Sequence, residues 1–190
     1  MNPVRPRPFI VLLAAAAAAV FVSCSSRQPE TPSPPATPAM TPVQRGEYLV
    51  SITACNDCHT PGALFGAPDF NRKLSGSEAG WRGPWGVSYA SNLTPDPETG
   101  IGAWTDAEVE RALRSGVKKD GSPVAPPMPW PDLARLSAED MAAVIAYLRS
   151  LAPVKHKNLG PIPPGRSATG SIIAFPAPSA WDVPKPAGAK

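Results

Sequence analysis

The chain has 190 residues with 18 Lys and Arg against 15 Asp and Glu, a net charge of +3 that argues against nucleic acid as a partner. Proline supplies 27 residues, about one in seven, which excludes long runs of regular helix or sheet. Once terminal segments are set aside, the length suits one small domain and not a multidomain enzyme. Three cysteines, an odd number, fit a disulfide framework poorly.

Residues 1–24 have the pattern of an export signal. Two arginines precede an uncharged apolar run, residues 9–22, and these 14 residues are too few for a membrane-spanning helix, which needs roughly 20. The run ends at Ser23-Cys24, which resembles the lipobox of bacterial lipoproteins, whose cysteine carries the lipid. We therefore expect a signal peptide of the lipoprotein type, with the chain on the periplasmic side and anchored to a membrane through Cys24. A permanent anchor helix, or ordinary cleavage beside an incidental cysteine, is the alternative.

Residues 25–40 are rich in Pro, Ser and Thr. This composition predicts an extended, semi-rigid tether rather than a folded element. It would hold a folded domain, residues 41–152, away from the membrane surface.

Three helices are predicted within residues 41–152. Each begins at a Ser or Thr that is followed three residues later by Gln, Glu or Asp, at Thr41, Thr105 and Ser137. Gly116 is expected to end the second helix and Pro153 the third. No strand pattern or internal repeat is evident. Three short helices with long loops make a thin core, which suggests that a large cofactor fills the middle. The third helix carries the clearest apolar stripe: Met141, Val144, Ile145, Leu148 and Leu151.

The segment Cys55-Asn56-Asp57-Cys58-His59 is a C-x-x-C-H motif, which is typical of covalent haem attachment. Two thiols on one helical turn reach the two vinyl groups of a haem, and His59 supplies an imidazole to the iron. A zinc site would need four ligands, and its only further candidates, Cys24 and His156, lie in the terminal segments. A thioredoxin-like dithiol site would need a βαβ context, which the sequence does not show. The motif therefore predicts one covalently bound haem c.

A methionine thioether is the expected sixth ligand of the iron. Met128 lies in the stiff segment Pro126-Pro127-Met128-Pro129-Trp130-Pro131, where prolines fix the backbone and hold the sulfur at a set distance. Met141 is on the apolar stripe of the last helix, so core packing is its expected role. His156 is a weaker alternative, and Met128 as a simple loop anchor is another.

The haem site needs further polar groups. The second ring nitrogen of His59 is expected to bond a carbonyl, from Pro61 or a near neighbour. The two haem propionates need hydrogen-bond donors. The alternative role of the aromatic candidates, Trp85 and Tyr89, is to cover the haem edge. Four candidates cluster in one loop: Arg82, Trp85, Tyr89 and Asn92.

Residues 153–190 form a basic tail rich in proline, which is expected to lack regular structure and to be dispensable for haem attachment. Apolar side chains in the tail remain candidates for docking on the domain surface. They are Ile172, Ile173, Phe175 and Trp181.

These motifs together resemble the class I cytochrome c family, and more narrowly the haem domains in cytochrome subunits of membrane-bound alcohol and gluconate dehydrogenases. The resemblance covers roughly residues 41–152. It implies an all-α fold of three to four helices and long loops around one haem, with His59 and Met128 as axial ligands and the first and last helices crossing where Gly46 meets Tyr147. The stretches that carry it are residues 55–59, 91–96, 100–102, 104–105, 128–130 and 146–149.

The sequence therefore predicts a periplasmic monohaem electron carrier that exchanges electrons with a dehydrogenase or an oxidase. Two occupied axial positions leave no place for substrate, so we do not expect an enzyme. The dehydrogenase subunits carry three haem domains, and this chain has one C-x-x-C-H motif, which leaves the partner open. The alternatives are a sensory or catalytic domain that binds a small ligand at the haem, and a dedicated subunit of a dehydrogenase or oxidase.

Overall fold

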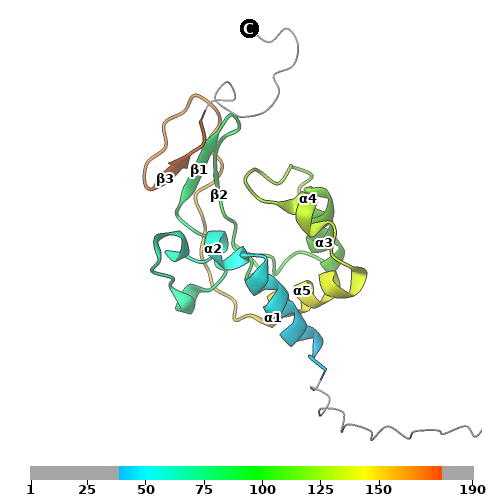
Figure 1. The fold of residues 1–190 in the computed structure, drawn as a ribbon. Helices are drawn as coiled ribbons and strands as arrows, with labels where there is room; N and C mark the ends of the chain where they lie inside the picture. The colour runs from blue at the N-terminus through cyan, green and yellow to red at the C-terminus, as the bar shows by residue number, and fades with distance from the viewer. Residues whose placement is uncertain (1–38, 177–190) are drawn as a thin grey trace, which may run out of the picture. The chain divides into compact units, whose positions relative to one another are not determined.

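The computed structural model describes residues 39–176. The signal peptide, most of the tether, Cys24 and Trp181 lie outside them. Figure 1 shows the elements in chain order. They are α1 (Pro42–Ile52), α2 (Cys55–His59), the 3-10 turns η1 (Ala63–Phe65) and η2 (Phe70–Arg72), β1 (Gly80–Gly83), β2 (Gly86–Tyr89), α3 (Asp106–Ser115), α4 (Trp130–Leu133), α5 (Ala138–Ser150) and β3 (Ile172–Ala174).

The three predicted helices begin at their predicted caps. The hydroxyl of Thr41 accepts a hydrogen bond from the backbone of Gln44 in α1, and Thr105 does the same in α3. In both helices the side chain of the third residue accepts a hydrogen bond from the backbone N–H of the cap residue, which completes a capping box. Ser137 caps α5 in the same way, without the reciprocal bond. Gly116 ends α3 with φ near +65°, a conformation that glycine adopts without a Cβ clash.

The helices α1 and α5 pack against each other (Figure 1) and supply most of the buried core. Their closest approach is at Gly46. A Cβ atom at Gly46 would lie 2.0 Å from the carbonyl oxygen of Ala143 and 2.7 Å from Cβ of Tyr147, so only glycine permits this approach. Met141 is 1% exposed within the same core, which confirms its packing role. The crossing fixes the end of α1, and α2 with its two cysteines follows directly.

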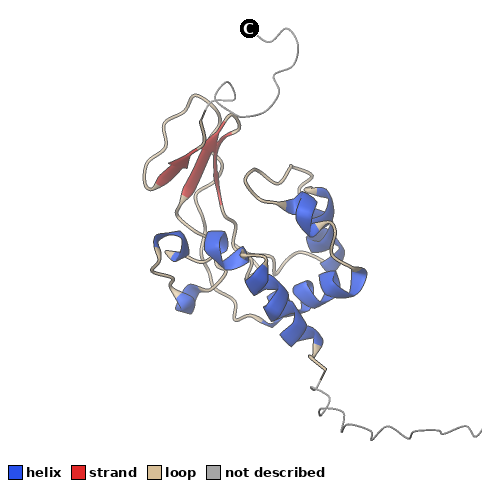
Figure 2. Cartoon of the chain, in the orientation of Figure 1, coloured by secondary structure: helices blue, strands red, loops and turns tan. Residues whose placement is uncertain are grey.

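A small sheet in the order β2-β1-β3 accompanies the helices (Figure 2). β1 and β2 form an antiparallel hairpin, and β3 pairs with β1 in parallel. Neither the sheet nor the regular structure in the tail was predicted from the sequence, where an all-α fold and an irregular tail were expected. The strands have only four, four and three residues, and glycines stand at both ends of β1 and at the start of β2, so no alternating pattern develops.

The tail after residue 152 packs against the domain. Ile172 and Ile173 belong to β3, and Phe175 lies against the rings of Trp81 and Trp85. The docking expected for the described apolar tail residues is therefore present, and it takes the form of strand pairing. None of the helices between residues 39 and 176 is both long and apolar enough to span a bilayer.

Candidate haem site

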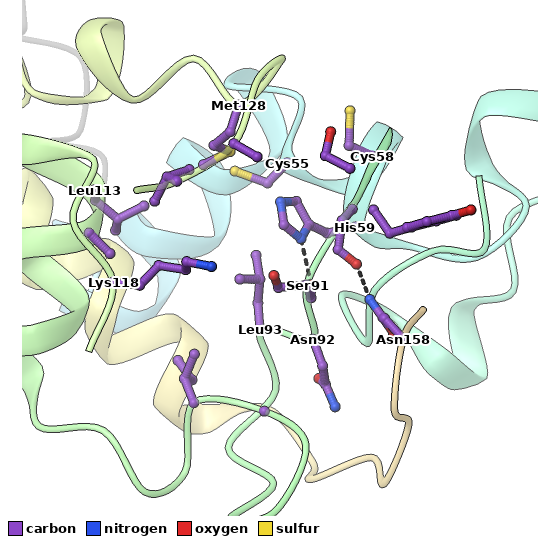
Figure 3. Close-up of a pocket in the computed structure, with 18 of the residues that line it drawn as sticks. Cys55, Cys58, His59, Ser91, Asn92, Leu93, Leu113, Lys118, Met128 and Asn158 are labelled. Atoms are coloured by element: carbon purple, nitrogen blue, oxygen red, sulfur yellow. Dashed lines mark hydrogen bonds between the residues drawn. The ribbon is translucent and has the colours of Figure 1, made fainter. Parts of the chain in front are cut away.

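A cavity of about 930 Å³ opens between α2, the segment after β2, α3, the loop before α4 and the tail. Ligand pockets in proteins usually measure about 300–1,000 Å³, so this one has room for a large ligand. Figure 3 shows residues that line it. Apolar side chains from several elements make up much of the lining, among them Val50, Leu93, Ile101, Leu113, Val124 and Leu148.

The α2 helix presents two free thiols to this cavity. Cys55 and Cys58 both line it and neither is in a disulfide. Ala54, just before them, has φ near +57°, a left-handed conformation that is uncommon outside glycine and that turns the chain into α2. Burial raises the pKa of both thiols from the ordinary value of 9.0. The two sulfurs are thus protonated, free of any disulfide and one helical turn apart.

His59 offers a neutral imidazole to the cavity. Its side chain is buried, and burial lowers its pKa from 6.5, against the opposing effect of a hydrogen bond to Ser91. The ring Nδ1 lies 2.7 Å from the carbonyl oxygen of Ser91 (Figure 3). With Nδ1 donating its hydrogen there, the lone pair is on Nε2, which is the form that binds a metal. A carbonyl near Pro61 was expected to accept this hydrogen bond, but the acceptor is the carbonyl of Ser91. The fold brings Ser91 to His59 although the two residues are 32 positions apart in the chain.

Met128 reaches the cavity from the loop before α4 (Figure 3). Local backbone hydrogen bonds fix this loop: the N–H of Met128 donates to the Ala125 carbonyl, and the N–H of Trp130 donates to the Met128 carbonyl. The two competing ligand candidates lie elsewhere. Met141 is in the core, and the ring of His156 contacts the Ser75 carbonyl at 2.9 Å. Neither is among the described residues that line the cavity.

The four candidate propionate contacts divide into two pairs. Tyr89 and Asn92 line the cavity, whereas Arg82 and Trp85 do not. Arg82 is exposed on β1, and the indole N–H of Trp85 donates to the Trp81 carbonyl at the hairpin. The two residues lie in and beside a hairpin that turns them away from the cavity, which the sequence could not show without the strands.

Tyr89 and Asn92 differ in how far their polar atoms are already used. The amide nitrogen of Asn92 donates to the Val154 carbonyl at 2.7 Å and to the Thr99 hydroxyl at 3.1 Å, so Asn92 ties the loop to the tail. The hydroxyl of Tyr89 is buried and has no hydrogen-bond partner among the described residues. A buried hydroxyl seldom stays unpaired. A carboxylate on a bound ligand would satisfy it, and the cavity residues therefore fit a haem with its two propionates.

The tail contributes to this cavity, which was not predicted from the sequence. Residues 155 and 157–161 line it. The Asn158 amide donates to the Ala90 carbonyl, and the backbone N–H of Val154 donates to the Thr94 hydroxyl. No local signal reveals this wall, since every one of these contacts joins residues about 60 or more apart in the chain.

Metal binding by side chains alone is not supported in residues 39–176. No group of three or more His, Cys, Asp or Glu side chains there is arranged to hold a metal ion. A haem needs less from the protein, because the porphyrin supplies four ligands and the protein only the axial ones.

A mainly helical fold that brings a C-x-x-C-H segment, a buried neutral histidine and a methionine to one large apolar cavity defines a c-type cytochrome domain. The chain belongs to the cytochrome c family, whose sequence profile matches residues 43–152. The resemblance noted from the motifs is thereby confirmed, and with it the class I type of fold, to which this chain adds a small sheet. Membership of the family implies a covalently bound haem c, and Cys55 and Cys58 fit its attachment motif.

Three similar proteins are cytochrome subunits of dehydrogenases. The cytochrome c subunit of the quinone alcohol dehydrogenase of Gluconobacter oxydans (strain 621H) is 42% identical over 120 residues, which cover 63% of this chain and 23% of that protein. The gluconate 2-dehydrogenase cytochrome c subunit of Pantoea cypripedii is 38% identical over 117 residues, 61% of this chain and 25% of that protein. The fructose dehydrogenase cytochrome subunit of Gluconobacter japonicus is 35% identical over 121 residues, 64% and 23% respectively. The matched region spans about a quarter of these relatives.

Proposed function

We propose that this chain is a monohaem c-type cytochrome that carries single electrons between redox partners and is not itself an enzyme. One observation carries the proposal: a neutral imidazole, a thioether and two free thiols meet at one cavity. The sequence contains a single C-x-x-C-H motif, which supports one haem per chain. The haem, when bound, supplies a reversible one-electron couple at its iron.

The protein residues have distinct tasks in this proposal. Cys55 and Cys58 hold the haem covalently through thioethers. The carbonyl of Ser91 orients the His59 ring and fixes the tautomer in which Nε2 faces the cavity. Met128 would supply its thioether as a further ligand to the iron, which would keep substrates from the metal. The apolar lining excludes water, and together with the axial thioether it favours a high reduction potential.

The redox partner is proposed from the relatives. Their names describe subunits of alcohol, gluconate and fructose dehydrogenases, and we infer that a dehydrogenase, or an oxidase downstream of one, exchanges electrons with this chain. The proposed location is the periplasmic side of a membrane, with a lipid on Cys24. This part rests on the sequence pattern alone, because residues 1–38 lie outside the described structure.

A matched pair of methionine variants tests the electron-carrier proposal. Met128→Ala should lose the weak red-end band of ferric Met–iron ligation and bind added cyanide readily, while its haem stays attached. Met141→Ala should keep the band and lose stability instead, by about 2–5 kcal/mol, because Met141 is a buried core residue. The reverse pattern would make Met141 the ligand. A wild-type protein that lacks the band and binds cyanide would favour the sensory or catalytic alternative.

A further inference from the structure

Lys118 extends its side chain into the haem cavity. The residue lies in the turn just after α3, where its N–H donates to the Ser122 carbonyl at 2.9 Å and its own carbonyl accepts from Gly121 at 3.0 Å. Arg111 also donates to that carbonyl at 3.1 Å. With its backbone held in this way, Lys118 points its Nζ toward the side of the cavity where His59 and Leu93 lie (Figure 3).

The ammonium group of Lys118 has no ion pair and donates no hydrogen bond to a described residue, unlike the ammonium groups of Lys119 and Lys155. Lys119 donates to the Ala103 carbonyl at 2.5 Å and lies 3.6 Å from a carboxylate oxygen of Glu108. Lys155, also at the cavity, pairs with Glu98 at 2.7 Å. The nearby carboxylate of Asp120 feels the charge of Lys118, yet it accepts its hydrogen bonds from the backbone and hydroxyl of Ser122.

An ammonium without a partner at the wall of an apolar cavity is free to pair with an anion that a ligand supplies. A haem brings two carboxylates. The geometry points to Lys118 as the counter-cation of a haem propionate, an inference that rests on the proposed haem and goes beyond it. Tyr89, with its unpaired hydroxyl, is a second donor to the same class of group.

This assignment has an electrical consequence. Reduction of the iron adds one negative charge to the haem. A fixed positive charge at the edge of the haem stabilises the reduced form relative to the oxidised form. A charged Lys118 therefore raises the reduction potential. Lys119, one residue further on, carries the same charge but is turned to Ala103 and Glu108, so its effect on the haem is weaker.

The experiment compares four variants of the full-length holoprotein: Lys118→Gln, Lys118→Met, Lys118→Arg and, as the matched control, Lys119→Gln. The midpoint potential, the ferric spectrum and the mass of the denatured chain are measured for each. We expect Lys118→Gln and Lys118→Met to lower the midpoint potential by equal amounts. Lys118→Arg keeps the charge and should have the wild-type potential, and Lys119→Gln should change the potential much less. The two uncharged replacements differ in polarity, so an equal shift reports the charge and not the packing.

Equal potentials in Lys118→Gln and Lys119→Gln would overturn the assignment, as would a Lys118→Arg protein with the potential of Lys118→Gln. A Met–iron band that is absent from the wild type and appears when Lys118 is replaced would place the amine at the iron and would also overturn the assignment. Absence of covalent haem from the wild-type mass would instead defeat the proposed function, and the two failures are distinguishable.

Discussion

The close crossing of α1 and α5 makes Gly46→Ala the most informative single change in the core. The added Cβ would lie 2.0 Å from the Ala143 carbonyl oxygen, against about 3.4 Å for an ordinary contact, a shortfall of about 1.4 Å. The atom in the way is backbone, so no side chain can rotate aside, and the helices must separate. Overpacking of this kind costs about 1–3 kcal/mol, and a backbone overlap belongs at the upper end.

A loss of about 3 kcal/mol is roughly a hundredfold in the folding equilibrium and a large share of the total stability of a small domain. Urea unfolding of the holoprotein, followed by the haem spectrum, would measure it. The control is Ser51→Ala, because Ser51 is an exposed position of the same helix and does not line the cavity. Equal unfolding midpoints for the two variants would refute the claim that the crossing requires glycine.

Three further changes test other parts of the fold. The hydroxyl and backbone N–H of Thr99 lower the pKa of Asp96 from its ordinary 3.8, so this stabilisation is present above about pH 4 and lost as the pH falls through the lowered pKa. Asp96→Asn should therefore make the free energy of unfolding depend less on pH below about pH 4. The same pH dependence as in the wild type would contradict this. Arg149→Ala removes the donors to the Ile101 and Trp104 carbonyls and should cost about 2–3 kcal/mol by urea unfolding; a cost below 0.5 kcal/mol, roughly the effect of a surface change, would show that water replaces them. Truncation after residue 152 should weaken or abolish the haem spectrum, because the removed segment lines the cavity; an unaltered spectrum would restore the expectation of a dispensable tail.

Local rules predicted the parts of this protein that depend on neighbours in sequence. The caps at Thr41, Thr105 and Ser137 each act over three residues, and the attachment motif spans five. Met141 was placed in the core from the periodicity of one helix. In each case a short stretch of chain contains the whole physical cause.

Contacts between distant segments lay beyond such rules. The carbonyl that orients His59 comes from Ser91, and the third strand comes from the tail. Arg82 and Asn92 lie only ten residues apart, yet one is exposed on the hairpin and the other is buried at the cavity. Their positions depend on how the chain folds back on itself, which neither composition nor spacing encodes.

The most direct test of the account is the mass of the chain after complete denaturation, for the wild type and for the double variant Cys55→Ala/Cys58→Ala, both made in a host that attaches haem. Free haem separates from an unfolded protein, whereas a thioether-linked haem stays. The account predicts the added mass of one haem on the wild-type chain and none on the variant. A wild-type chain without haem, or a variant that keeps it through denaturation, would contradict the central claim.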